Sequence, residues 1–381
     1  MIDILMKIIK AEVTGEKLKK DFLPSFTKEV LEQLYFISHK QDLSHIVALF
    51  LKEQNVPMEE RISKKFSESI YLALKRYENF EYEQNRIYEL FEKERICYIP
   101  LKGAVIRKYY HKPWLRTSGD IDILIKKEDL ERAQQILTKE LQYSIAFYNY
   151  HDASMYSKTG VHLELHFNLL ENVENIDQLL EKVWEHVYPI KQGSYRYAME
   201  KEYFMFYILA HMYYHFLHGG CGVRTVIDMW LLFKQQYNGE VLNEYCKMCG
   251  IDTFAEYILK LTKVWFEGGA HCETTYRLQQ YVIKGGVYGS KESAITAKRT
   301  KQNGRGIYVL KRIFMSYKEL CVLYPELKRY PIFYPYYCIK RLRKVFKPTV
   351  FYKSLNEAKI NYSINKSEVD QLQELFKSLK I

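Results

Sequence analysis

The sequence predicts an α+β protein in which a small mixed sheet lies between an amino-terminal and a carboxy-terminal helical region. Three observations predict this arrangement. Apolar residues recur at helical spacing in residues 1–95, alternate with polar residues in residues 96–170, and return to helical spacing in residues 171–381. A chain of 381 residues is long enough for two or three domains, and these three ranges are the domains that we predict.

The composition is typical of a folded protein without a membrane span. Apolar residues make up 48% of the chain and aromatic residues 15%, which excludes global disorder. No run approaches the roughly 18 apolar residues of a transmembrane helix, and the amino terminus lacks the features of a signal peptide. The seven cysteines are odd in number and irregularly spaced, as expected in a reducing compartment. We therefore expect a cytoplasmic protein.

The positive charge is concentrated toward the carboxy terminus. The net charge is +11, and residues 291–347 contain fifteen Lys and Arg against three Glu. A basic segment of this kind attracts a nucleotide, a nucleic acid or an anionic surface. The alternative is a solvated positive face on helices.

The amino-terminal region has the spacing of amphipathic helices. Leu31, Leu34 and Ile37 recur three residues apart, and residues 59–94 continue this rhythm. Residues 59–94 contain neither Gly nor Pro, so they predict one long helix or two abutting helices. We expect this region to have a structural role.

A short strand and a glycine turn open the central region. Residues 96–101 predict a strand, in which Pro100 requires a free edge or a strand end. Gly103 then permits a tight turn into a helix over residues 104–110. Unpaired amides at the start of a helix form an anion site, and Lys102 lies beside it.

The next predicted strand carries two carboxylates on one face. Asp120 and Asp122 alternate with Ile121, Ile123 and Ile125, so the isoleucines point to one side of a strand and the carboxylates to the other. Two like charges about 7 Å apart repel each other and lose hydration when covered, unless a cation lies between them. Mg²⁺ suits this position, because proteins hold it with carboxylates and substrate phosphates. The alternative is a pair of surface acids on an edge strand.

A third carboxylate lies on a later strand. The intervening chain predicts a helix and two strands, over residues 126–140, 143–150 and 153–158. A Thr-Gly turn then leads into a strand over residues 161–167, in which His162, Glu164 and His166 share one face. This second strand therefore presents Glu164 to what we expect to be the same cleft.

Helical spacing returns after Leu170. We predict helices over residues 200–218, 224–237 and 366–379. His211 and His215 lie one turn apart on the first of these helices. Two ligands without a third are weak evidence for a metal site, so we expect these histidines to pack or hydrogen-bond near the core.

The order of these motifs resembles that of the DNA polymerase β-like nucleotidyltransferase superfamily, in which a glycine turn, a helix, an Asp-x-Asp strand and a third acidic residue follow one another. The runs at residues 101–104, 120–122 and 164–166 look most like a poorly characterised bacterial nucleotidyltransferase family labelled type 5. That family also has His-x-x-x-His and Arg-x-x-x-Asp elements, similar to residues 211–215 and to Arg224 with Asp228 here. The resemblance spans most of the chain.

The resemblance implies two-metal transfer of a nucleoside monophosphate from an NTP, with Mg²⁺, or alternatively Mn²⁺, as the cofactor. It implies that Asp120, Asp122 and Glu164 are the metal ligands and the catalytic residues. Lys102 and the amides near Gly103 would bind the phosphates of the nucleotide.

Two more residues have a possible place in this site. Arg116 is close enough to the metal strand to reach a phosphate, or else it anchors its loop to Asp152 or to a backbone carbonyl. His166 shares the face of Glu164, so it would support a ligand or face the acceptor. The alternative for His166 is a structural histidine with satisfied hydrogen bonds.

Two departures from the family pattern leave other functions open. Lys102 replaces a small residue of the usual turn, and Ala104 stands where a serine is common, so position 104 has no hydroxyl to contact a phosphate. A metal-dependent glycosyltransferase that uses a nucleotide-sugar is one alternative, and a catalytically silent binding module of the same fold is another. The acceptor is open as well, and a small molecule, a protein or a nucleic acid would each be compatible.

Overall fold

The computed structural model describes residues 1–18, 26–287, 289–300, 316–317, 320–321, 324, 326–345 and 348–381. These residues form two compact units, the first of residues 1–214 and 223–275 and the second of residues 215–222 and 276–381. The domain boundaries predicted at residues 95 and 170 stay predictions. Part of the predicted basic segment, including Lys301, Arg305, Lys311, Arg312, Lys318 and Lys347, lies outside the described residues.

A five-stranded mixed sheet forms the centre of the first unit. Its strands are β1 (Tyr98–Pro100), β2 (Ile121–Ile125), β3 (Ser144–Tyr148), β4 (Asp152–Tyr156) and β5 (His162–His166). They lie in the order β1-β2-β5-β4-β3, with β2 and β5 parallel and every other neighbouring pair antiparallel. The predicted α+β class with a small mixed sheet is therefore confirmed.

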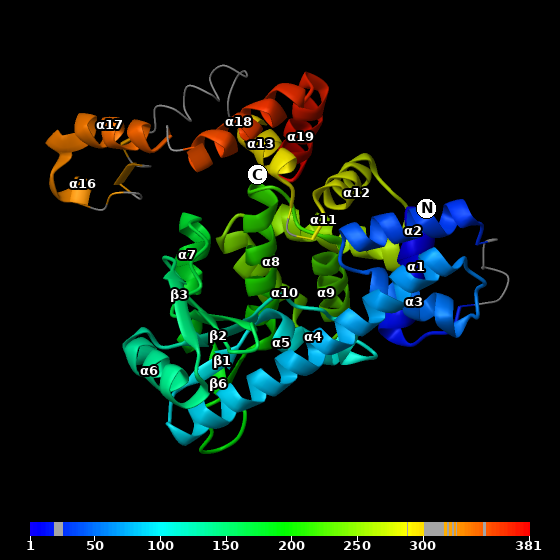
Figure 1. Ribbon diagram of the computed structural model, residues 1–381, viewed down its shortest axis with the longest axis horizontal. Helices are drawn as coiled ribbons and strands as arrows, with labels where there is room; N and C mark the ends of the chain where they lie inside the picture. The colour runs from blue at the N-terminus through cyan, green and yellow to red at the C-terminus, as the bar shows by residue number, and fades with distance from the viewer. Residues whose placement is uncertain are drawn as a thin grey trace. The chain divides into compact units, whose positions relative to one another are not determined.

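The apolar face of this sheet is buried by two helices. Ile121, Ile123 and Ile125 join Leu163 and Leu165 in one buried cluster with residues of α4 (Glu60–Lys93) and α6 (Leu130–Leu141). With no Gly or Pro to interrupt it, α4 is a single helix of 34 residues that runs along the sheet (Figure 1). Burial of the isoleucines on this side leaves the acidic side chains on the other.

The first unit contains further helices, and those before α4 make up its amino-terminal part. The further helices are α1 (Ile2–Thr14), α2 (Lys28–Lys40), α3 (Ser44–Glu53), α5 (Lys102–Ile106), α7 (Glu174–Leu180), α8 (Lys201–Leu217), α9 (Val223–Phe233), α10 (Gly239–Met248) and α11 (Asp252–Phe266), with short 3₁₀ turns η2 (Arg107–Tyr109), η3 (Pro113–Leu115), η4 (Lys127–Asp129) and η5 (Val183–Glu185). The last three residues of α8 belong to the second unit. Among the described residues, no helix combines the length and apolarity needed to cross a bilayer.

The second unit is helical in its described parts. Its elements are α12 (Glu273–Gly285), which begins in the first unit, α13 (Lys291–Thr300), α16 (Glu326–Arg329), η6 (Pro331–Phe333), α17 (Tyr334–Val345), α18 (Pro348–Ser363) and α19 (Lys366–Ser378). Ile295 on α13 forms a small buried cluster with Ile364 and with Val369 of α19. The terminal helix predicted over residues 366–379 is confirmed.

The expectation that the chain is helical throughout after Leu170 is wrong in one segment. Strands β6 (Val187–Pro189) and β7 (Tyr197–Met199) pair antiparallel as a two-stranded ribbon. Pro189 lacks the N–H that a helix interior requires, and Gly193 has a φ of 79°, which turns the chain back. The ribbon also covers part of the edge of β1, because Tyr98 N–H donates to the Tyr195 carbonyl over 2.9 Å.

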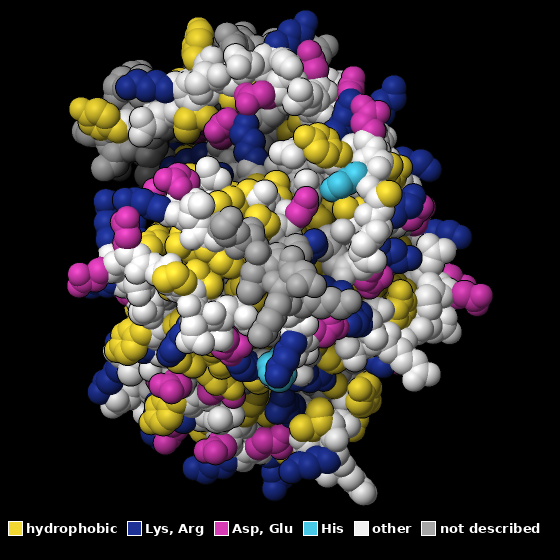
Figure 2. Space-filling view, turned by 90° about the vertical axis from the view of Figure 1, so that its right-hand side faces the viewer, with side chains coloured by type: hydrophobic (Ala, Val, Ile, Leu, Met, Phe, Trp, Pro, Cys, Tyr) yellow, Lys and Arg dark blue, Asp and Glu magenta, His cyan; other side chains and the backbone are white. Residues whose placement is uncertain are grey.

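Charged side chains of both signs are interspersed on the face drawn in Figure 2. Lys and Arg lie among Asp and Glu there, with hydrophobic side chains between them. On this face the net positive charge of the chain is therefore not gathered into one basic patch.

Candidate active site

The three predicted acids meet on the polar face of β2 and β5. Asp122 lies directly opposite Glu164 in the parallel register, and Asp120 comes two residues earlier, just before β2 begins. Neighbouring strands are about 4.8 Å apart, so this register brings two carboxylates from different strands side by side. Asp122 is buried, whereas Asp120 and Glu164 are partly exposed. The structure therefore brings all three together at one partly open place.

Histidines complete two groups of potential metal ligands at these carboxylates. One group is Asp120, His162 and Glu164, and the other is Asp122, Glu164 and His166. In each group the ligand atoms all lie within 4.8 Å of one another. Carboxylate oxygens and imidazole nitrogens are donors for divalent cations, so the residues present fit the metal that the resemblance implies.

Lys102 contributes a positive charge to this cluster. Its Nζ donates to Asp122 Oδ1 over 2.8 Å, and the lysine side chain is only 18% exposed. Burial is the largest single effect and opposes the charged form of this lysine, but the negative charges around it, with that of Asp122 the largest, together hold the pKa of Lys102 well above its usual value. The backbone of Lys102 has a φ of 41°, in the left-handed region that favours glycine. The lysine thus takes a strained conformation while its ammonium group neutralises a metal-ligand candidate.

His166 supplies a second cation to the same carboxylates. Its Nε2 lies 3.0 Å from Asp122 Oδ1 and 3.5 Å from Glu164 Oε2. Burial alone would lower the pKa of His166, but the hydrogen bonds to Asp122 and Glu164 raise it to about 9. The imidazole is therefore protonated at neutral pH, and its buried Nδ1 has no hydrogen-bond partner. Beside it, the His151 ring is stacked at a centroid distance of 5.5 Å.

The pKa values of the two aspartates move in opposite directions. Burial, then the negative charge of Asp122, raises the pKa of Asp120 to about 7. Burial also disfavours the ionised form of Asp122, but Lys102 and His166 hold its pKa well below its usual range. Asp122 is thus neutralised within the protein, whereas Asp120 remains short of positive charge. This crowding is what a bound cation would relieve.

Gly103 is required by space. A Cβ at Gly103 would collide with Ser118 Oγ and would lie 3.3 Å from Arg116 Nη1. The residue with left-handed backbone at this turn is Lys102, not Gly103 as the sequence suggested. Helix α5, which begins at Lys102, has only five residues, so its dipole adds little to the binding of an anion. The predicted phosphate contacts would come mainly from the Lys102 ammonium and from individual amides.

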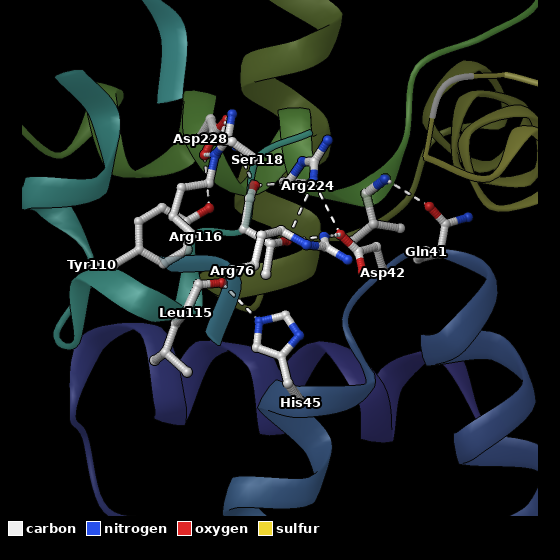
Figure 3. Close-up of polar contacts among 12 residues, drawn as sticks. Gln41, Asp42, His45, Arg76, Tyr110, Leu115, Arg116, Ser118, Arg224 and Asp228 are labelled. Carbon is white, nitrogen blue, oxygen red and sulfur yellow. Dashed lines mark hydrogen bonds and ion pairs between the residues drawn. The ribbon is translucent and has the colours of Figure 1, made fainter. Parts of the chain in front are cut away.

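Arg116 has buried partners close to this turn. Its guanidinium pairs with Asp228 on α9, with Nη2 and Oδ2 2.8 Å apart, and Nη1 donates to the Thr117 carbonyl over 2.6 Å (Figure 3). Tyr110 donates to Asp228 over 2.7 Å. Of the two anchors expected for Arg116, a backbone carbonyl is observed. Asp152, the other, instead accepts from Asn149 over 2.7 Å.

A second arginine of α9 holds the same loop. Arg224 Nη1 donates to the Thr117 carbonyl over 3.1 Å and lies 3.4 Å from Asp42 Oδ2, which also accepts from the Thr117 hydroxyl and from Arg76 (Figure 3). The loop that leads into the Asp120 strand is therefore tied to α9 and to the amino-terminal helices. We infer that the Arg-x-x-x-Asp element positions this loop.

Sequence reasoning missed most of this network. Arg224 and Asp228 are four residues apart, a spacing that places both side chains on one face of α9, and this was the available signal. Nothing local marks Asp42, which lies 182 residues from Arg224. Its partner could not be chosen from the sequence.

Helix α8 brings two more polar side chains toward the carboxylates. Burial raises the pKa of Tyr207, and the charges of Lys102 and Asp122 act on it as well. Burial, then Lys102, lowers the pKa of His211 well below its usual range, and His211 Nδ1 lies 2.7 Å from Glu171 Oε1. His211 is therefore hydrogen-bonded near the core, as expected. The other predicted histidine, His215, belongs to the second compact unit.

Comparison with known proteins identifies one family. No curated protein matches the chain. A similar solved structure is a Thermotoga maritima CCA-adding enzyme complexed with tRNA, with 11% identity over 78% of this chain and 81% of that chain and a TM-score of 0.21. At this TM-score the likeness carries no weight. Residues 28–267 match a family described as uncharacterised nucleotidyltransferase, a range that covers more than half of the chain. The protein therefore belongs to this nucleotidyltransferase family, as the resemblance of its motifs implied.

Proposed function

We propose that the protein is a metal-dependent nucleotidyltransferase that transfers a nucleoside monophosphate from an NTP to an acceptor and releases pyrophosphate. One observation carries this proposal: Asp122 lies directly opposite Glu164 on neighbouring parallel strands, with Asp120 beside them. Three converging carboxylates with a lysine at hydrogen-bonding distance suit the binding of cations and of a triphosphate.

Each residue has a distinct role in the proposed site. Asp120, Asp122 and Glu164 hold the divalent cations, which when bound neutralise the triphosphate and favour ionisation of the acceptor. Lys102, together with the N–H groups near Gly103, contacts the phosphates. His166 holds two of the carboxylates in place through its Nε2. Arg116 fixes the loop before Asp120, and a phosphate contact by its guanidinium stays a prediction.

Two alternatives use the same carboxylates. A glycosyltransferase would hold a nucleotide-sugar through a metal at Asp120 and Asp122, but the family match favours nucleotidyl transfer. A silent binding module would need a defective site, and here the three carboxylates converge. The acceptor stays open among small molecules, proteins and nucleic acids.

The test is calorimetric titration with each Mg²⁺-NTP, and with Mn²⁺ in place of Mg²⁺, followed by a search for label transfer from α-³²P-NTP. We expect at least one NTP to bind only with the metal, and binding to disappear in the Asp120→Asn/Asp122→Asn double variant. Asp129→Asn is the matched control, because Asp129 is a partly exposed acid in η4, shortly after β2, and is not part of the carboxylate cluster. Binding of a nucleotide-sugar but no NTP would favour the glycosyltransferase.

A further inference from the structure

His162 lies at the open side of the carboxylate cluster. It is the first residue of β5, on the same face as Glu164, and its ligand atom lies within 4.8 Å of those of Asp120 and Glu164. Its ring is partly exposed, so a cation from solvent can reach it. An Asp-x-Asp strand with a third acid makes no use of this position, and no motif in the chain assigns His162 a role.

The imidazole ring of His162 is held in a fixed orientation. It is stacked on Tyr156, the residue opposite it on β4, with ring centroids 4.7 Å apart and an interplanar angle of 15°. Its Nε2 is hydrogen-bonded to Ser154 Oγ, and Ser154 is only 1% exposed. A histidine that binds a metal characteristically gives its other ring N–H to an oxygen acceptor, which fixes its tautomer. A proton on Nε2 directed at Ser154 leaves the lone pair of Nδ1 for a cation.

The other ligand group is already neutralised by the protein. Asp122 is paired with Lys102 at 2.8 Å and with His166 at 3.0 Å, and His166 also lies 3.5 Å from Glu164. Across the described residues, no ion pair reaches Asp120. Asp120 is therefore the carboxylate of the cluster that has no ion-pair partner among the described residues, and it belongs to the group that contains His162.

We propose that His162 is a metal ligand, and that Asp120, His162 and Glu164 form a cation site that selects Mn²⁺ or another first-row transition ion over Mg²⁺. Mg²⁺ binds oxygen ligands and keeps its waters, whereas imidazole nitrogen suits transition ions. This inference rests on the proposed function for the place of the cation, and it adds an imidazole ligand to two of the three carboxylates, Asp120 and Glu164.

Electron paramagnetic resonance of the full chain with Mn²⁺ tests the ligand directly. Loss of the free Mn²⁺ signal gives the number of bound ions and their affinity, and electron spin-echo modulation detects a ¹⁴N nucleus bound to the ion. We expect one Mn²⁺ per chain without nucleotide, with ¹⁴N modulation. His162→Gln should abolish the modulation and weaken Mn²⁺ binding at least tenfold, with a smaller change for Mg²⁺ measured by calorimetry. Ser154→Ala should weaken Mn²⁺ binding about tenfold, because it frees the ring.

His166→Gln is the matched control at the same carboxylates, and it should keep the ¹⁴N modulation. Absence of bound Mn²⁺, absence of ¹⁴N modulation in the wild type, or modulation that survives in His162→Gln would overturn the proposal. These outcomes are separable from failure of the proposed function. If Mn²⁺-NTP binds and pyrophosphate is released without ¹⁴N modulation, only the imidazole ligand is wrong.

Discussion

The backbone of Lys102 leads to a prediction about stability. Its φ of 41° costs a residue with a Cβ about 1 kcal/mol or more, whereas glycine adopts this conformation without strain. Lys102→Gly and Lys102→Ala both remove the ammonium group that pairs with Asp122. The two variants therefore differ only in how easily residue 102 adopts the left-handed backbone conformation. We expect Lys102→Gly to be more stable than Lys102→Ala by about 1 kcal/mol in urea unfolding.

Lys64→Gly and Lys64→Ala, at an exposed position of α4, serve as the control pair. In the middle of a helix the order reverses, and the Gly variant should be less stable than the Ala variant by about 1 kcal/mol. If Ala is the better residue at position 102 as well, the left-handed turn is not formed in solution.

Residue patterns predicted one face of the site but not its ion pairs. Alternation of Asp120 and Asp122 with isoleucines gave the polar side of β2, and the same alternation placed Glu164 and His166 on one side of β5. The pairing of Lys102 with Asp122 joins residues twenty positions apart through a strained turn. No local pattern specifies such a contact, because it depends on how the turn is folded.

At the scale of elements, the contact of α9 with the loop before β2 depends on a buried ion pair. The side chains of Arg116 and Asp228 are 9% and 4% exposed. Removing one partner leaves an uncompensated buried charge, which typically costs 3–5 kcal/mol. We expect Asp228→Asn and Arg116→Met each to lower the free energy of unfolding by about 3 kcal/mol.

The double variant tests whether these two side chains act as a pair. It should lose clearly less stability than the sum of the single losses, because neither charge is then left alone. Glu256→Gln is the control, since its exposed pair with Lys260 should be worth no more than about 0.5 kcal/mol. Additive losses in the double variant would show that Arg116 and Asp228 are not coupled.

Helix α1 carries a buried acid that makes stability depend on pH. Burial, then the nearby charge of Glu53, raises the pKa of Glu12 from 4.5 to about 7, and this residue is 7% exposed. A raised pKa means that the folded state holds the proton more tightly than the unfolded state. The stabilisation is therefore complete below pH 4.5 and is lost as the pH rises through about 7.

Glu12→Gln should remove this loss. We expect the variant to exceed the wild type in stability by about 3 kcal/mol at pH 8.5 and to match it near pH 4.5, as measured by urea unfolding. Glu60→Gln, at the exposed start of α4, should show no such difference. Equal curves for Glu12→Gln and the wild type at every pH would mean that Glu12 is solvated.

Elements with a strong periodic pattern were predictable, and the two-stranded ribbon of β6 and β7 was not. The long apolar rhythm without Gly or Pro predicted α4, and alternation on either side of a Thr-Gly turn predicted the strands β4 and β5, which pair antiparallel. The sequence did not predict the ribbon of β6 and β7, because each of its strands has only three residues, too few to show a clear alternation of apolar and polar side chains. Its position is set instead by pairing with Tyr98.

At the scale of the molecule, the family was predictable because its motifs are local. The runs at residues 101–104, 120–122 and 164–166 are short enough to be read directly, and the family match over residues 28–267 bears them out. The division into two units was not predictable, since residues 215–222 leave the first unit within a helical stretch. Contacts between distant segments decide that division, and the sequence does not display them.

The basic carboxy-terminal segment predicts salt-dependent binding of a polyanion. Lys328, Arg329, Lys340 and Arg343 are exposed in the described part of this segment. Replacing all four by Gln should weaken binding of a duplex DNA probe. It should also reduce the slope of log affinity against log salt by about 0.9 for each side chain that contacts a phosphate. Fluorescence anisotropy at several salt concentrations measures both effects.

A control variant that loses four positive charges in the first unit distinguishes a local contact by the basic segment from an effect of the net charge of the chain. Lys52, Lys64, Lys75 and Lys93 are exposed in the first unit, and replacing them by Gln lowers the net charge by the same amount. If the basic segment binds the polyanion, this control should keep nearly the full salt slope, because its charges act only within a Debye length of about 8 Å. If both sets lower the slope equally, the attraction comes from the overall charge of +11 and not from the carboxy-terminal segment.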